Sequence, residues 1–149
     1  MAYFGLSNQT YGLYVWIIET LIVLTLTLAV IEARRLRIEH HRAMVITCYS
    51  VQWLMVLSWM GRNFLHNFNR FNTDWDERWT LLLHVIIGSL VLLLATGWIV
   101  TMYVDPDIHV AKLKRGKPLM RTVYTLWVIN YLIGSFNYFN RWYWKIPIY

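Results

Sequence analysis

Two histidines, His66 and His84, frame the most polar stretch of the chain, "NFLHNFNRFNTDWDERWTLLLH" at residues 63–84. Imidazole nitrogens bind haem iron and copper, so this stretch is a candidate metal or haem site. Acidic residues of the same segment could join His66 in a site built from oxygen and nitrogen ligands. The alternative is a solvated loop in which an aspartate caps the helix that follows. The acidic residues concerned are Asp74, Asp76 and Glu77.

The composition predicts which elements position these histidines. Apolar residues make up 58% of the 149 residues and charged residues only 15%, too little polar surface for a small soluble protein. The apolar residues form long blocks, a pattern typical of transmembrane helices. We predict an all-α fold, a four-helix transmembrane bundle in one domain, with spans at residues 13–33, 43–64, 79–104 and 120–139. "DPDIHVAKLKRGKP" predicts a turn and connector, with Pro118 opening the fourth span.

The net charge of +6 predicts how this bundle lies in the membrane. Basic residues gather after the first span and before the fourth, which places these two loops in the cytoplasm and both termini on the non-cytoplasmic side. We expect a multi-pass protein of the plasma membrane whose basic residues contact phospholipid headgroups. No motif indicates nucleic-acid binding. The basic residues concerned are Arg34, Arg35, Arg37, Arg42, Lys112, Lys114, Arg115 and Lys117.

Polar residues within the predicted spans are the default functional candidates of a membrane protein. All of them fall in the predicted outer half of the bilayer, and helical spacing directs His84 into the bundle rather than towards lipid. They predict a buried polar cluster, which is either a hydrogen-bonded network that fixes helix register or a functional site. In the first case Glu19 pairs with Arg62 or His84. The cluster consists of Glu19, Arg62, His84, Asn130 and Asn137.

The predicted depths bear on the two framing histidines. His66 projects about one turn above the outer surface, whereas His84 lies below it, and this offset argues against a pair of axial ligands on one haem. We therefore expect a wet outer loop with a buried histidine just beneath it. His41, in the basic cytoplasmic loop, is the remaining metal-ligand candidate beside His84 and His66, and the cofactors to consider are haem and copper.

Three stretches resemble a known family: "HHRAMVITCYSVQWL", "LLLHVIIGSLVLL" and "MRTVYTLWVINYLIG". Their order is similar to the small four-helix membrane proteins of the YozB/CtaM type, which are associated with the assembly of haem-copper cytochrome oxidases. The resemblance covers roughly residues 40–138 and implies an accessory role near a terminal oxidase. The chain has "KLKRGKPLM" where the family has a histidine before the last span. The matching residues are His41, Met44, His84, Arg121, Thr122, Trp127 and Gly134.

Three functions are compatible with these features. The first is a non-catalytic accessory or structural subunit of a larger membrane redox complex of the respiratory chain, or its assembly factor, with other membrane subunits as partners. A terminal oxidase and a copper membrane monooxygenase would both accept such a subunit. The second is a haem- or copper-binding electron carrier that uses His84 with His66 or His41. The third is a small proton conductor or transporter that uses Glu19 and His84. No catalytic motif indicates an enzyme.

Overall fold

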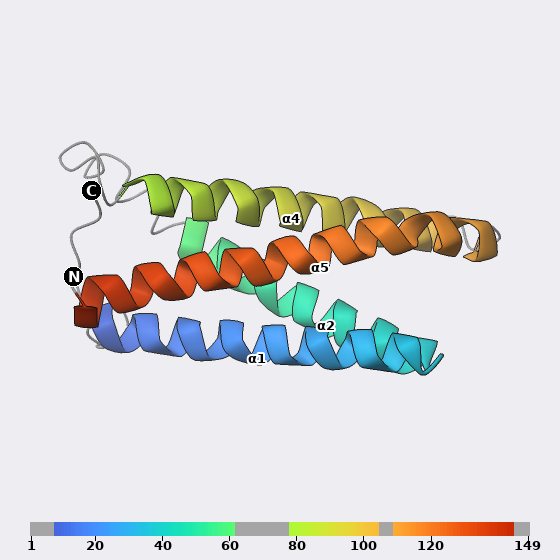
Figure 1. Ribbon diagram of the computed structural model, residues 1–149, viewed down its shortest axis with the longest axis horizontal. Helices are drawn as coiled ribbons and strands as arrows, with labels where there is room; N and C mark the ends of the chain where they lie inside the picture. The colour runs from blue at the N-terminus through green and yellow to red at the C-terminus, as the bar shows by residue number, and fades with distance from the viewer. Residues whose placement is uncertain (1–7, 62–77, 105–108, 145–149) are drawn as a thin grey trace. The chain divides into compact units, whose positions relative to one another are not determined.

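The computed structural model describes residues 8–61, 78–104 and 109–144. The elements in these ranges are α1 (Asn8–Arg34), α2 (Ile38–Met55), the π-helix η1 (Val56–Met60), α4 (Arg78–Val104), α5 (His109–Phe139) and the π-helix η4 (Asn140–Trp144). Apart from the turn that joins α1 to α2, every described residue is helical (Figure 1). The predicted all-α class is therefore confirmed.

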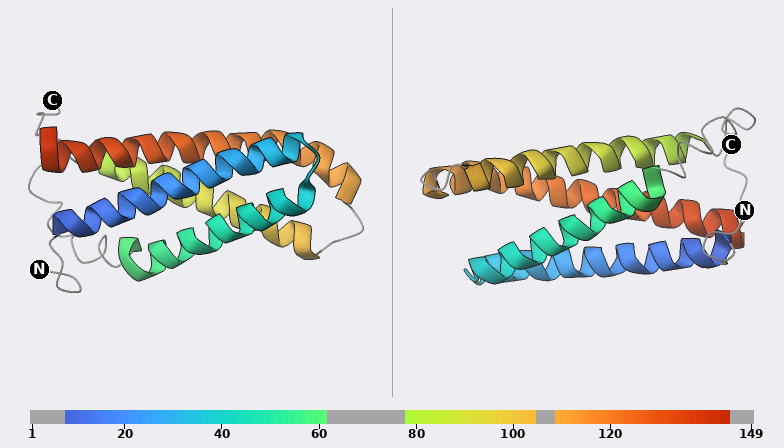
Figure 2. Two further views of the ribbon diagram at one scale, coloured as in Figure 1. Left: turned by 90° about the horizontal axis from the view of Figure 1, so that it is seen from below. Right: turned by 180° about the vertical axis from the view of Figure 1, so that it is seen from behind.

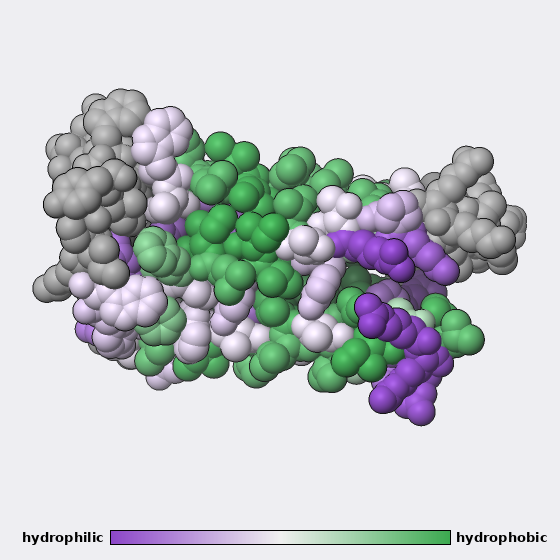
Figure 3. Space-filling model, in the orientation of Figure 1, coloured by the Kyte–Doolittle hydropathy of each residue, from purple (hydrophilic) through white to green (hydrophobic). Residues whose placement is uncertain are grey.

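Two of these helices are long and apolar enough to cross a membrane, namely Gln9–Arg34 in α1 and Trp79–Thr101 in α4. At about 1.5 Å per residue, each exceeds the roughly 30 Å of a bilayer's hydrocarbon core. Their large apolar side chains are widely exposed, with Leu24 57% and Leu93 65% accessible. Figure 3 shows this apolar character along the visible face of α1, where the hydrophilic side chains gather at the end that leads into α2.

The chain divides into two compact units. The first comprises Met1–Arg78 together with Lys145–Tyr149, and the second comprises Trp79–Trp144. The first unit therefore contains α1, α2 and η1, and the second contains α5, η4 and nearly all of α4. Each unit is a pair of long helices and is described by itself.

In the first unit, α1 and α2 run antiparallel and side by side from the short turn that joins them (Figure 2). Ile22, Leu26 and Ala29 are buried on α1, and Cys48 is buried on α2. The three α1 residues recur at intervals of about one helical turn, as expected of the face that packs on a neighbouring helix. Ala29 is the most buried of them at 1% exposure, and its small side chain lets the two backbones come close.

In the second unit, α4 and α5 also run antiparallel (Figure 1). Val91 and Leu92 of α4 and Trp127 of α5 are buried. Near one end of the pair, the ring of Trp98 occupies the space where a side chain on Gly116 would begin. Only glycine leaves room for an indole ring at this position, so the two residues set how closely α4 and α5 approach here.

One helix boundary differs from the prediction. The structure begins α5 at His109 and places Pro118 inside this helix, so the prediction that residues 109–117 form a connector and that Pro118 opens the helix is wrong. The predicted turn at residues 105–108 lies outside the described residues. Residues 110–115 are Val, Ala, Lys, Leu, Lys and Arg, most of which have high helix propensity. They extend the helix before the proline, although Pro118 cannot donate a hydrogen bond to the preceding turn.

Candidate functional site

His84 makes a polar contact between the two helices of the second unit. Its Nδ1 lies 3.0 Å from the backbone carbonyl oxygen of Asn130. A carbonyl oxygen only accepts hydrogen bonds, so Nδ1 carries the proton and donates it. The other ring nitrogen, Nε2, then holds the lone pair. This is the tautomer that a histidine needs in order to bind a metal through Nε2.

Two glycines complete this contact. A Cβ added to Gly134 would lie 2.8 Å from Cε1 of His84, and a Cβ added to Gly88 would lie 2.9 Å from Nδ2 of Asn130. Each helix thus contributes one polar side chain and, one turn further along, one glycine that accommodates the polar side chain of its partner. The motif His84–Gly88 on α4 is matched by Asn130–Gly134 on α5, and we call these four residues the histidine–asparagine clasp.

The amide oxygen of Asn130 is buried and has no hydrogen-bond partner among the described residues. The same holds for the amide nitrogen of Asn137, about two turns further along α5. A buried polar atom without a partner costs free energy in an apolar environment. The second unit therefore retains hydrogen-bonding capacity next to His84 that the described residues leave unused.

Glu19 is held in the first unit by a residue that the sequence analysis did not select. Nε2 of Gln52, on α2, donates a hydrogen bond of 2.7 Å to Oε1 of Glu19, on α1. Glu19 and Gln52 are both half-buried. The available signal was that Gln52 is a polar residue inside the predicted second span, where such residues require a partner.

His41 lies in the first turns of α2 rather than in a solvated loop, and it is half-buried. Its Nδ1 lies 2.8 Å from the carbonyl oxygen of Ala29 on α1, so it donates to a backbone oxygen of the neighbouring helix in the same manner as His84. About two turns further along α2, the Sγ of Cys48 lies 3.9 Å from the carbonyl oxygen of Ile22, a weak contact at most. His41, Cys48 and Gln52 thus form a polar seam between α1 and α2.

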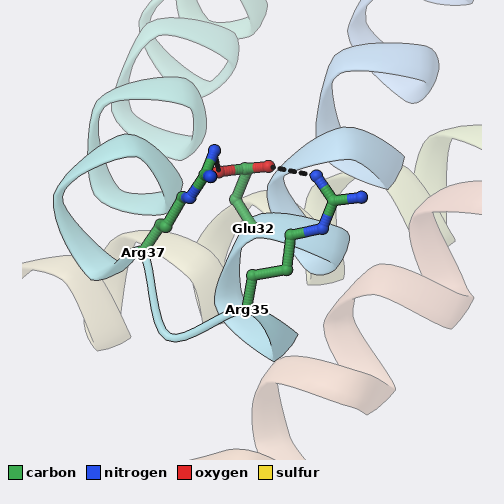
Figure 4. A network of polar contacts seen from close by, with 3 residues as sticks. All are labelled: Glu32, Arg35 and Arg37. Atoms are coloured by element: carbon green, nitrogen blue, oxygen red, sulfur yellow. Dashed lines mark hydrogen bonds and ion pairs between the residues drawn. The ribbon is translucent and has the colours of Figure 1, made fainter.

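The basic residues at the end of α1 surround one acid. Glu32 forms ion pairs with both neighbours (Figure 4): its Oε1 lies 3.4 Å from Nη1 of Arg35, and its Oε2 lies 3.5 Å from Nη1 of Arg37. Arg34 and Arg42 are exposed. Lys112, Lys114 and Arg115 lie in the first turns of α5, and Lys117, which follows them, is exposed.

The structure distributes the predicted polar cluster over the two units. Glu19 belongs to the first unit, whereas His84, Asn130 and Asn137 belong to the second. Arg62 and His66, as well as the acidic residues between His66 and His84, lie outside the described residues. Within the described ranges, no group of three or more His, Cys, Asp or Glu side chains is arranged to hold a metal ion.

The described contacts show what each helix pair can do chemically. The histidine–asparagine clasp and the seam between α1 and α2 hold polar side chains in defined orientations between apolar helices, and the clasp presents one imidazole nitrogen with an available lone pair. Comparison of the chain with family models, curated proteins and solved structures gives no match.

Proposed function

We propose that the protein is a multi-pass plasma-membrane protein that serves as an accessory or structural subunit, or an assembly factor, of a larger membrane redox complex. The observation that carries this proposal is that polar side chains are hydrogen-bonded between paired helices, whereas large apolar side chains are exposed on the outside of these pairs. The side chains of Glu19, on α1, and His84, on α4, are hydrogen-bonded within their own helix pairs. The outward faces of the same helices carry large exposed apolar residues such as Leu21, Leu28 and Leu90.

This pattern suits a protein whose surroundings are lipid and other membrane helices. Polar groups in hydrocarbon must find partners within the protein, whereas apolar side chains need none. Exposed apolar helix faces of this extent would be unfavourable in water. The polar contacts then fix the register of each pair, which leaves the outer faces free to contact neighbouring subunits.

We further propose that α2, continued by η1, and the later part of α5 cross the membrane with α1 and α4, which gives four spans. The sequence supports this proposal because residues 43–61 carry no charged side chain. The basic residues at the α1–α2 turn and at the start of α5 then mark the cytoplasmic side, and both termini face away from it. Protease and labelling experiments on intact cells test this orientation, and a terminus on the cytoplasmic side would contradict it.

The redox character of the complex is supported by the resemblance to the YozB/CtaM-type family. The residues that carry it include His84 and Gly134, which contact each other in the clasp. The test is to isolate the tagged chain from native membranes with a mild detergent and to identify what co-purifies. Subunits of a terminal oxidase or a copper monooxygenase are expected. Recovery of the chain alone, from membranes that contain these complexes, would contradict the proposal.

A second candidate function is supported by the orientation of His84. Because Nδ1 donates to the Asn130 carbonyl oxygen, Nε2 is available to ligate haem iron or copper. His41 keeps its own Nε2 available for the same reason. When bound, haem or copper would supply one-electron transfer, which is the chemistry of a membrane electron carrier. An optical spectrum and a metal analysis of the purified protein test this function. A Soret band lost in His84→Ala would favour it over a purely structural role.

A further inference from the structure

The turn between α1 and α2 has a backbone conformation that its sequence does not favour. Leu36 has a φ of 61°, in the left-handed region. The N–H of Leu36 donates to the carbonyl oxygen of Ala33 at 3.2 Å, and that of Arg37 donates to the carbonyl oxygen of Glu32 at 3.0 Å. These two bonds define a Schellman motif, the common helix ending whose left-handed residue is usually glycine. Here a leucine takes that position, at a cost of about 1–2 kcal/mol.

The side chain of Leu36 has little packing contact with the described residues. It is 83% exposed, and the next apolar residue, Ile38, is 46% exposed. In many Schellman motifs an apolar contact joins the residues that occupy the positions of Glu32 and Arg37, but here these two form an ion pair. A strained backbone that presents an apolar side chain away from the protein points to an external binding partner.

The charges around Leu36 indicate what this partner is. Arg35 and Arg37 flank it, with side chains 63% and 61% exposed. The carboxylate of Glu32 lies between the two guanidinium groups (Figure 4) and neutralises only one of them. The exposed Arg34 and Arg42 add positive charge and the exposed Glu39 adds a negative one, so residues 32–42, with four Arg and two Glu, carry a net charge of +2. An apolar tip surrounded by excess positive charge is complementary to the boundary between phosphate headgroups and acyl chains of an anionic bilayer leaflet.

We propose that this turn is a docking element for anionic phospholipid, in which Leu36 and Ile38 enter the acyl–headgroup boundary and Arg35 and Arg37 bind the phosphates above it. Glu32 lies between the two guanidinium groups and offsets part of their positive charge. The inference rests on the proposed function, since it requires α1 to cross the bilayer and end at the leaflet surface.

The charge component is tested with the full chain in phosphatidylcholine bilayers that contain spin-labelled phosphatidylglycerol or spin-labelled phosphatidylcholine. The wild type is expected to associate preferentially with phosphatidylglycerol. Arg35→Gln and Arg37→Gln each lower this preference by about fivefold, whereas Glu32→Gln raises it because a negative charge is removed. Lys at both positions keeps the preference. A preference that is unchanged in the double Gln variant would overturn the proposal, as would a decrease in Glu32→Gln.

The apolar component is tested with a nitroxide attached at Leu36→Cys. Cys48 is the only cysteine, so a single Cys48→Ala substitution provides the background. In phosphatidylglycerol-containing bilayers, we expect the label to collide more with oxygen than with a water-soluble nickel complex. A label as accessible to nickel as a free nitroxide in water would refute the proposal. If it became shielded only in native membranes, the partner would be a protein instead.

A label at Leu24→Cys, in the middle of α1 and exposed to 57%, distinguishes failure of the lipid-docking inference from failure of the proposed function. If this label is inaccessible to nickel while the label at position 36 is fully accessible, α1 crosses the membrane and only the lipid-docking inference fails. If both are accessible, α1 does not cross the membrane, and the proposed function fails with it.

Discussion

The imidazole of His84 lies directly against the backbone of Gly134, so close that a Cβ on this glycine would come within 2.8 Å of Cε1 and 3.2 Å of Nδ1. The ring cannot easily move away, because its Nδ1 is hydrogen-bonded to the carbonyl oxygen of Asn130, which lies on α5 like Gly134. The glycine and the hydrogen bond therefore depend on each other, and this dependence allows the clasp to be tested with very small substitutions.

Gly134→Ala is expected to destabilise the α4–α5 pair. The added methyl group forces the His84 ring off its hydrogen bond, and overpacking of this kind costs about 1–3 kcal/mol, against a gain of about 1 kcal/mol from the higher helix propensity of alanine. Gly88→Ala acts through Asn130 in the same way, since its Cβ would lie 2.9 Å from Nδ2. The measurement is the SDS concentration at which the purified protein loses helical packing.

Gly97 provides the matched control. It lies on α4, and apart from its sequence neighbours and the nearby backbone of α4, no atom of the described residues lies within 4 Å of the position of an added Cβ. Gly97→Ala is therefore expected to leave the SDS concentration at which helical packing is lost unchanged, or to raise it slightly through helix propensity alone. Equal effects at positions 97 and 134 would show that the clasp does not govern the packing of this pair.

The tautomer of His84 gives a second prediction. In ¹⁵N spectra of histidine-labelled protein, His84 is expected to carry its proton on Nδ1 and to show a bare Nε2, because the Asn130 carbonyl oxygen accepts from Nδ1. Assignment follows from the loss of the signal in His84→Asn. A proton found on Nε2 would remove the basis for ligation of haem or copper at this nitrogen.

The hydrogen bond between Gln52 and Glu19 leads to a third prediction. Gln52→Leu removes the donor at 2.7 Å and leaves the carboxyl group of Glu19 half-buried without this partner. We expect a loss of stability of about 1–3 kcal/mol, since an unsatisfied polar group costs more than the bond itself contributes. Glu19→Gln keeps an acceptor for Gln52 and is expected to cost less than 1 kcal/mol. Chemical denaturation in detergent measures both variants.

The same pair bears on the hypothesis of proton conduction. If Glu19 serves only to join α1 and α2, Glu19→Gln leaves proton flux into liposomes at the level of the wild type. The double replacement Glu19→Leu with Gln52→Leu should recover most of the stability lost in Gln52→Leu, because both polar groups are then absent. A flux that falls in Glu19→Gln would instead support the transport hypothesis.

The sequence predicted much of the helical architecture, because apolar blocks bounded by charged residues are a strong signal. Residues 79–104, expected as a span, lie within α4 at Arg78–Val104. The start of α5 was predicted wrongly because Pro118 is a frequent helix initiator, and this local preference concealed the helix-forming residues before it. Local sequence cannot decide between these two signals.

The partners of polar residues were harder to predict than the residues themselves. Glu19 stood out as the only charged residue before Glu32 in the first apolar block, but its bond to Gln52 depends on the register between α1 and α2. Register is a tertiary property, set by contacts between the helices such as the hydrogen bond from His41 to the backbone of Ala29. Similarly, the use of glycine as the counterpart of His84 and Asn130 became visible only once α4 and α5 were aligned.

The last prediction concerns the strained turn. Leu36→Gly is expected to stabilise the α1–α2 pair by about 1 kcal/mol, because glycine adopts a φ of 61° without the Cβ clash that leucine suffers there. Leu36→Ala is the matched control. It removes the same exposed side chain beyond Cβ but keeps the clash, so it should show no such gain. The denaturation midpoint of the full chain in a neutral detergent, where no anionic lipid is present, measures the difference between the two variants. If the two variants were equally stable, the left-handed backbone at Leu36 would carry no strain, and the choice of leucine there would need no external partner to explain it.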